Sequence, residues 1–166
     1  MNRHNVPPLG LVIVAALSVA CGTARGGDVA PTAAPVAQDA AAVERAALAD
    51  HYLALAGPLN VRVGDLAKRV DKASGLAAMR DISLAYAAVE DEFATGLRAL
   101  AAPDDLKPMV VAAITAAEKV AALNRRAAAG GDMTGVGAGL GDALDAQRLA
   151  LGRLRGALGL GPVPAG

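Results

Sequence analysis

The sequence predicts an all-α protein, an antiparallel four-helix bundle, and three observations support this fold class. Apolar residues recur every three or four positions in four successive stretches, which places them on one stripe of each helix. Short segments rich in Gly, Pro and Asp separate the stretches, so that neighbours in sequence become neighbours in space. Hydrophobic residues make up 54% of the chain but aromatic residues only 2%, which favours an aliphatic core between closely packed helices.

The first helix is predicted to begin near Asp39 and to be the longest. Its apolar stripe continues in register through Pro58, although a proline inside a helix removes a backbone hydrogen bond and costs about 3 kcal/mol. Because the register agrees on both sides, we expect one long helix kinked at Pro58 rather than two helices. Gly75 is expected to end it in a left-handed conformation. The stripe consists of Leu48, Tyr52, Leu55, Leu59, Val63, Leu66 and Val70.

The second helix is predicted over about residues 76–101. The third is predicted to start at Leu106-Lys107-Pro108, after the acids Asp104 and Asp105, and to run to about Ala129. Pro103 closes the second helix, and Gly130-Gly131 ends the third. Both segments repeat the spacing of the first helix. Their expected inward residues are Met79, Ile82, Tyr86, Val89, Phe93, Leu97 and Leu100, then Val110, Ile114, Ala117, Val120 or Ala121, and Leu123.

Three adjacent acids, Glu90, Asp91 and Glu92, lie in the second helix. Side chains at adjacent positions fan around the helix axis rather than converging on one point. A hard cation needs several oxygens converging within about 2.5 Å, so these acids would need help from other helices to bind one. We therefore expect a solvated face here and no metal site.

The fourth helix is predicted to begin near Asp132 or Thr134. Four glycines at alternate positions, 135 to 141, each cost about 1 kcal/mol relative to alanine, so the first two turns are expected to fray unless packing holds them. The glycines are not a nucleotide loop, because neither a βαβ unit nor Gly-Lys-Ser or Gly-Lys-Thr accompanies them. Gln147 is expected to face inward and to set register or bond a neighbouring backbone. The stripe is Val136, Leu140, Leu144, Gln147, Leu151, Leu154 and Leu158.

Residues 1–20 have the layout of a secretory signal peptide, with Arg3 before an apolar run over 9–17. This run is too short to cross a bilayer, which takes about 20 apolar residues. Its end, Leu17-Ser18-Val19-Ala20-Cys21, resembles a bacterial lipobox, in which the cysteine receives a diacylglyceryl group. Ser18 stands where that pattern prefers leucine, and Ser18-Val19-Ala20 also fits an ordinary secretory cleavage site. Lipidation, ordinary secretion and an uncleaved anchor therefore all stay open.

The single cysteine of the chain, Cys21, favours lipidation among these alternatives. It has no cysteine with which to form an internal disulfide, and covalent diacylglyceryl gives it a role. Two or three acyl chains hold a protein on a bilayer where one chain dissociates. We expect an exported protein anchored by lipid to the outer face of the cell membrane. Residues 21–38 would be the lipidated N-terminus and a flexible tether, 39–160 the bundle and 161–166 a disordered tail.

The residue inventory argues against several kinds of chemistry. The formal net charge is zero and no basic stripe is present, so no nucleic-acid partner is expected. After signal cleavage a serine-histidine arrangement would need His51 beside Ser74 or Ser83, and Ser74 fits a loop or cap while His51 lies at the edge of its stripe. One histidine and an acylated cysteine do not supply the usual zinc ligands. We expect no catalytic residue, no metal, no cofactor besides the lipid, and no enzyme activity.

The stretch from Tyr52 to Asn60 and the ending Leu154-Arg155-Gly156-Ala157-Leu158-Gly159-Leu160-Gly161-Pro162 resemble the Ala-rich helical-bundle domains of small bacterial lipoproteins. The resemblance spans about residues 39–162 and implies no activity. It suggests a lipid-anchored structural or protein-interaction module with an envelope protein as partner. The alternatives are a carrier for a small apolar ligand in the bundle core, marked by an apolar pocket of about 300 Å³ or more, and an exported enzyme with an unrecognised site.

Overall fold

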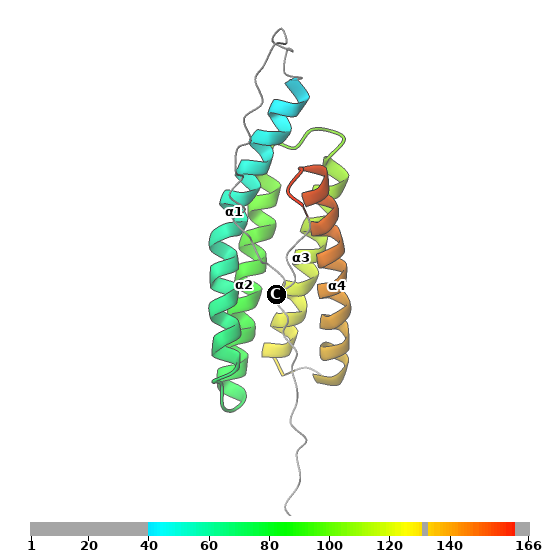
Figure 1. The fold of residues 1–166 in the computed structure, drawn as a ribbon. Helices are drawn as coiled ribbons and strands as arrows, with labels where there is room; N and C mark the ends of the chain where they lie inside the picture. The colour runs from blue at the N-terminus through cyan, green and yellow to red at the C-terminus, as the bar shows by residue number, and fades with distance from the viewer. Residues whose placement is uncertain (1–39, 131–132, 162–166) are drawn as a thin grey trace, which may run out of the picture.

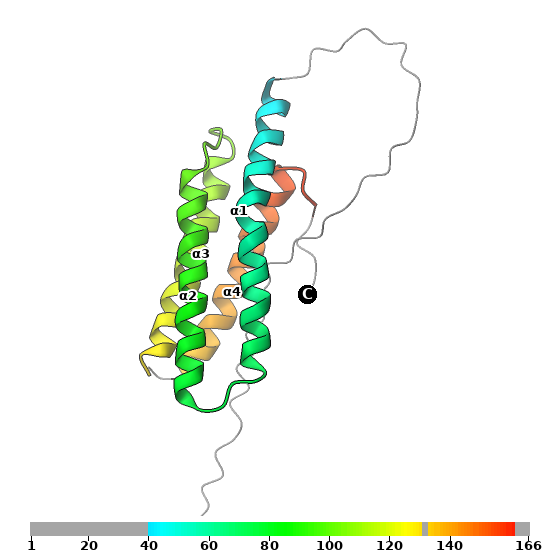
Figure 2. The same ribbon diagram turned by 90° about the vertical axis from the view of Figure 1, so that its left-hand side faces the viewer.

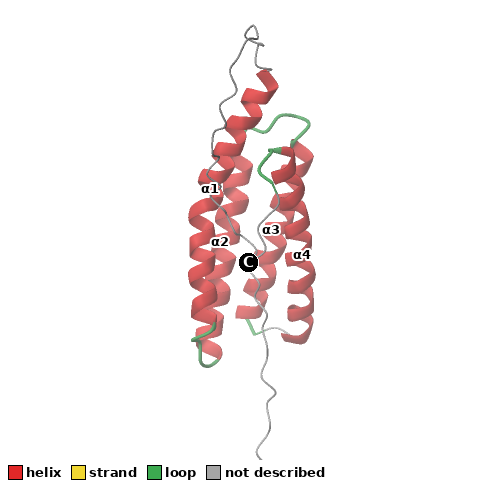
Figure 3. Ribbon diagram, in the orientation of Figure 1, coloured by secondary structure: helices red, strands yellow, loops and turns green. Residues whose placement is uncertain are grey.

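The computed structural model describes residues 40–130 and 133–161, and in these ranges the chain forms four α-helices and no strand (Figure 3). The helices are α1 (Ala40–Val70), α2 (Leu76–Ala99), α3 (Lys107–Ala128) and α4 (Met133–Ala157). They run alternately up and down, and each packs beside the next in sequence (Figure 1). The predicted antiparallel four-helix bundle is confirmed.

The helix α1 is continuous over its 31 residues, Pro58 included, which confirms one helix rather than two. The carbonyl that Pro58 leaves without an intrahelical partner belongs to Ala54, four residues earlier. Both residues are exposed, so water can satisfy that carbonyl and the helix continues. The kink at Pro58 stays a prediction.

The role expected for Gly75 is wrong. The helix α1 already ends at Val70, and the chain then turns through hydrogen bonds such as Ala73 N–H to the Val70 carbonyl. Gly75 does adopt positive φ, 85°, but it does so as the residue preceding α2. Its positive φ therefore sets the entry to the second helix, not the exit from the first.

The Gly-rich start of α4 is helical, and the neighbouring core explains why. Val136 and Leu140 are buried, the latter in a small cluster with Val120 of α3 and Ala143. This burial offsets the cost of the glycines between them. At the other end, Gly159 has φ 72°, and the Leu160 N–H bonds the Arg155 carbonyl at 2.9 Å, which is a Schellman cap.

The main core lies between all four helices and is aliphatic, as expected. Tyr52 of α1 meets Phe93 of α2 edge to face, with ring centroids 6.3 Å apart, at its centre. Many of the buried residues of α2 and α3 are small. They include Ala87, Ala94, Ala113, Ala117 and Ala121. Most predicted stripe residues are buried; those only half-buried are Leu55, Val70, Met79, Leu100, Ile114, Leu123 and Leu144.

The start of α1 extends past the ends of the other helices (Figure 2). Residues 41–47 are all exposed, and the first buried side chain is that of Leu48. Arg45 in this overhang forms an ion pair at 2.6 Å with Asp105, in the α2–α3 connection. The overhang is therefore helical but lies outside the core.

Candidate functional site

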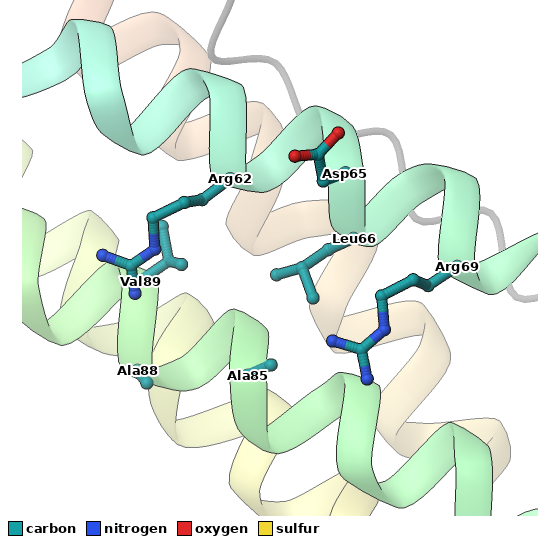
Figure 4. A pocket seen from close by; sticks show the side chains of 7 residues that line it. All are labelled: Arg62, Asp65, Leu66, Arg69, Ala85, Ala88 and Val89. Atoms are coloured by element: carbon teal, nitrogen blue, oxygen red, sulfur yellow. The ribbon is translucent and has the colours of Figure 1, made fainter.

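A surface groove of about 350 Å³ lies between α1 and α2. Four of its lining residues come from α1, namely Arg62, Asp65, Leu66 and Arg69, and three from α2, namely Ala85, Ala88 and Val89 (Figure 4). Leu66 and Val89 are buried and form an apolar floor. The small side chains of Ala85 and Ala88 leave the space above that floor open. Because Arg62, Arg69 and Ala88 are exposed, the groove faces solvent.

The charged groups of the groove are arranged asymmetrically. The side chains of Arg62 and Arg69 extend from α1 toward α2, whereas the Asp65 carboxylate points away from α2 (Figure 4). Asp65 pairs at 2.9 Å with Lys68, outside the groove lining. The groove therefore presents two guanidinium groups over an apolar floor.

The two guanidinium groups differ in their ion-pair partners. Arg62 forms an ion pair with Glu92 of α2, and both side chains are about half exposed. Within residues 40–130 and 133–161, no ion pair or hydrogen bond engages the Arg69 guanidinium. Exposed pairs contribute about 1 kcal/mol or less, so the bond of Arg62 is readily exchanged for another carboxylate.

A second polar feature lies inside the bundle and corrects an expectation. Glu90 was predicted on a solvated face, yet its side chain is only 5% exposed and accepts a hydrogen bond from Gln147 Nε2 of α4 at 2.5 Å. The other two acids are on the surface: Asp91 pairs with Arg125, and Glu92 with Arg62. The three carboxylates thus fan apart as expected, but one of them enters the core. Gln147 faces inward as predicted, with a carboxyl group as its partner.

Burial raises the pKa of Glu90 to about 7, from 4.5 for an ordinary glutamate. The hydrogen bond from Gln147 works against this rise, and the neighbouring charge of Asp91 adds to it. Removing a carboxylate from water disfavours its charged form. Glu90 therefore holds its proton to near-neutral pH.

Near the C-terminal end of α4, Arg155 joins three parts of the fold. Its guanidinium lies 6.0 Å from the ring centroid of Tyr52 on α1, and it donates to the carbonyls of Leu160 at 3.1 Å and Gly161 at 3.3 Å. Burial raises the pKa of Tyr52 above its ordinary value, and the hydrogen bond and positive charge of Arg155 offset part of that rise. Arg155 is only 5% exposed, and these contacts account for a buried cation.

The structure does not bring the candidate serine and histidine residues together. His51 is exposed beside Tyr52, which packs on Phe93, whereas Ser83 lies ten residues before Phe93. At 1.5 Å per residue, that separates Ser83 from the level of Phe93 by about 15 Å along α2. Ser74 lies in the α1–α2 connection at the far end of α1.

The described part of the chain offers neither a metal-binding cluster nor a membrane-spanning helix. Residues 40–130 and 133–161 hold no group of three or more His, Cys, Asp or Glu side chains arranged to bind a metal ion. None of the described helices combines the length and hydropathy that a membrane span requires. Cys21, the predicted signal peptide and tether, and residues 162–166 of the predicted tail lie outside the described residues.

Comparisons with protein-family models, with curated proteins and with solved structures found no match for this chain.

Proposed function

We propose that this chain is a lipid-anchored protein of the cell envelope, and that its bundle is a structural or protein-interaction module. The groove between α1 and α2 is the observation that carries the interaction role. It combines buried apolar residues with exposed guanidinium groups, a mixture that suits the surface of another protein. The anchor rests on the sequence around Cys21.

The groove does not suit the alternative of a carrier for a small apolar ligand in the core. Such a ligand needs an enclosed and mostly apolar site, whereas this groove opens on the surface and is lined by Arg62, Asp65 and Arg69. The enzyme alternative would need an accessible group with a shifted pKa. Glu90 has a raised pKa, but both it and Gln147 are buried. Asp104 is exposed, and its pKa is lowered by the hydrogen bond from its neighbour Lys107, which is a local surface pair.

The anchor is tested by the mass of the mature protein. Intact protein extracted from membranes with detergent should begin at Cys21 and carry the added mass of a diacylglyceryl group. The variant Cys21→Ala should lose that mass and leave the membrane fraction or remain unprocessed. Ser83→Ala, which keeps Cys21, serves as the control and should remain membrane-bound. Unmodified protein in the culture medium, beginning at Cys21, would refute the anchor.

The interaction role is tested separately, by photo-cross-linking in intact cells. A photoreactive amino acid at Ala88, in the groove, should give adducts with an envelope protein. The same amino acid at Val111, exposed on α3, is the matched control. If no position on the bundle gives an adduct while the protein is membrane-bound, the interaction role is wrong.

A further inference from the structure

We propose that the α1–α2 groove binds an acidic amphipathic helix of a partner protein, one that carries two carboxylates seven residues apart with apolar side chains between them. This inference rests on the proposed interaction role and gives it a site and a partner chemistry.

The spacing of Arg62 and Arg69 on α1 determines the spacing of the two acids on the partner helix. Arg62 and Arg69 are seven residues apart on α1 and both extend toward α2 (Figure 4). Seven residues are close to two helical turns, so the two groups share a face and are separated by about 10 Å along the axis. A partner helix lying along the groove repeats this spacing with acids at positions i and i+7. Each guanidinium can then bind a carboxylate through two parallel hydrogen bonds.

The floor of the groove sets what lies between the acids. Leu66 and Val89 form its base, and Ala85 and Ala88 leave room for side chains from outside. On a partner helix, positions i+3 and i+4 lie between the two acids on the same face. Apolar residues there would enter the groove. Leu84 of α2, 51% exposed and one turn before Ala88, extends the apolar surface beside it.

The surrounding charges favour a protein segment over an anionic bilayer. A flat membrane surface would meet the exposed acids Asp65 and Glu92 together with the two arginines, so that attraction and repulsion nearly cancel. A helix within the groove meets the arginines from the side where Asp65 is turned away, and one of its carboxylates replaces Glu92 on Arg62. Complementary charge therefore selects a narrow acidic ligand.

A synthetic helical peptide tests this proposal directly against the full-length chain. The probe carries two glutamates seven residues apart and leucines at the third and fourth positions after the first glutamate, and fluorescence anisotropy measures its binding. The matched peptide has glutamine in place of both glutamates. We expect the acidic peptide to bind, and the variant Arg62→Gln/Arg69→Gln to weaken binding about tenfold or more. The control, Arg126→Gln/Arg153→Gln, changes two exposed arginines on α3 and α4 and should bind as the unchanged protein does.

Three results would overturn the proposal. They are failure of the acidic peptide to bind, equal binding of the glutamine peptide, and binding that survives the change of both groove arginines. Vesicles containing phosphatidylglycerol form a parallel arm; if only they bind, and through Arg62 and Arg69, the surface recognises membrane and the helix proposal is wrong. Cross-links to an envelope protein that form from Val111 and not from Ala88 would remove the groove while leaving the interaction role intact.

Discussion

Glu90 of α2 and Gln147 of α4 meet inside the bundle, with 2.5 Å between Oε2 and Nε2 and with each residue only 5% exposed. Most of the surrounding core side chains are aliphatic. A carboxyl group in such a place is stable mainly in its protonated form, which carries no charge to desolvate. The free energy of keeping this hydrogen-bonded pair inside the bundle therefore depends on pH.

The bundle should therefore be less stable at pH 8 than at pH 5. In the unfolded chain Glu90 ionises near 4.5, whereas in the folded protein it keeps its proton to about 7. Between these values the folded state binds more protons, so the free energy of unfolding falls as pH rises. The full shift corresponds to roughly 3 kcal/mol above pH 7, and the interval from pH 5 to pH 8 contains roughly three quarters of it, because Glu90 of the unfolded chain is already mostly ionised at pH 5. Urea denaturation at the two pH values measures it.

The variant Glu90→Gln should remove this part of the pH dependence, because its amide is neutral at every pH and its oxygen can still accept from Gln147. At pH 8 it should be more stable than the unchanged protein by roughly 2 to 3 kcal/mol, and near pH 4 about equal. Glu92→Gln changes a half-exposed acid and should shift stability by less than about 1 kcal/mol. An unfolding midpoint of the unchanged protein that stays flat between pH 5 and pH 8 would disprove the account.

Two glycine substitutions should differ although both replace glycine by alanine within a helix. A Cβ at Gly96 of α2 would lie 2.3 Å from Leu55 Cδ1 of α1, whereas one at Gly141 of α4 would meet nothing within 4 Å. Gly141→Ala should gain about 0.5 to 1 kcal/mol from helix propensity. Gly96→Ala should lose this gain and about 1 kcal/mol more, because Leu55 must move.

Thermal and urea unfolding of the two alanine variants measure this difference. In the double variant Leu55→Ala/Gly96→Ala the clash disappears, so the two substitutions should be non-additive, and the double variant should be more stable than the sum of the single effects predicts. Equal gains for Gly96→Ala and Gly141→Ala would show that the helices do not approach each other at Leu55.

Tyr86→Phe should keep or raise stability, by up to about 1 kcal/mol. The Tyr86 hydroxyl is buried and has no hydrogen-bond partner among the described residues, and burial raises its pKa to about 12, with the charge of Asp71 adding to the rise. Removing a buried hydroxyl that bonds nothing relieves a desolvation cost while the ring continues to pack. Differential scanning calorimetry measures the change. A loss of about 1 kcal/mol or more would mean that a water molecule satisfies the hydroxyl.

Arg155→Met should destabilise the junction between α4 and α1. The substitution removes two hydrogen bonds to the carbonyls of Leu160 and Gly161 and the cation over Tyr52, while it keeps an unbranched apolar stem. We expect a loss of about 1 to 3 kcal/mol and faster amide exchange at the end of α4. Arg153→Met, on the exposed face of the same helix, should change stability by less than about 0.5 kcal/mol. Equal effects of the two variants would remove the special role of Arg155.

The helices were predictable because apolar spacing and terminal residues act locally. The stripe from Leu48 to Val70 identified α1 despite Pro58, and α3 ends at Ala128, just before the predicted stop at Gly130-Gly131. Gly75 was misassigned because its sequence position does not show which of two adjacent helices needs its positive φ.

Of the two polar residues that meet inside the bundle, only Gln147 was predicted to lie there. Gln147 was expected inside, since it interrupts a stripe of leucines. Glu90 was not, because two acidic neighbours made it resemble surface. The sequence did contain a signal for Glu90. A second stripe of mostly small residues runs along α2 beside the stripe of Tyr86 and Phe93, and such a stripe marks a face packed closely by another helix. Its members are Ser83, Ala87, Glu90 and Ala94. The partnership itself depends on the register between α2 and α4, which no local pattern contains.

The groove was missed for a similar reason. Arg69 lies among the basic residues that end α1, and Arg62 lies two turns earlier, so their spacing alone was visible in the sequence. The space between them exists because Ala85 and Ala88, on a different helix, stand opposite Leu66. Small residues leave a groove on the surface only once the neighbouring helix packs beside them.

The overhang at the start of α1 sets both the height and the direction at which the chain enters the core of the bundle. Its exposed residues 41–47 hold the helical path for about 10 Å before the first buried side chain, Leu48. Inserting one residue there would leave the core untouched, yet it would lift the chain's point of entry by about 1.5 Å and swing it by roughly 100° around the axis. The length of this stem thus sets the height and the direction at which the chain enters the core.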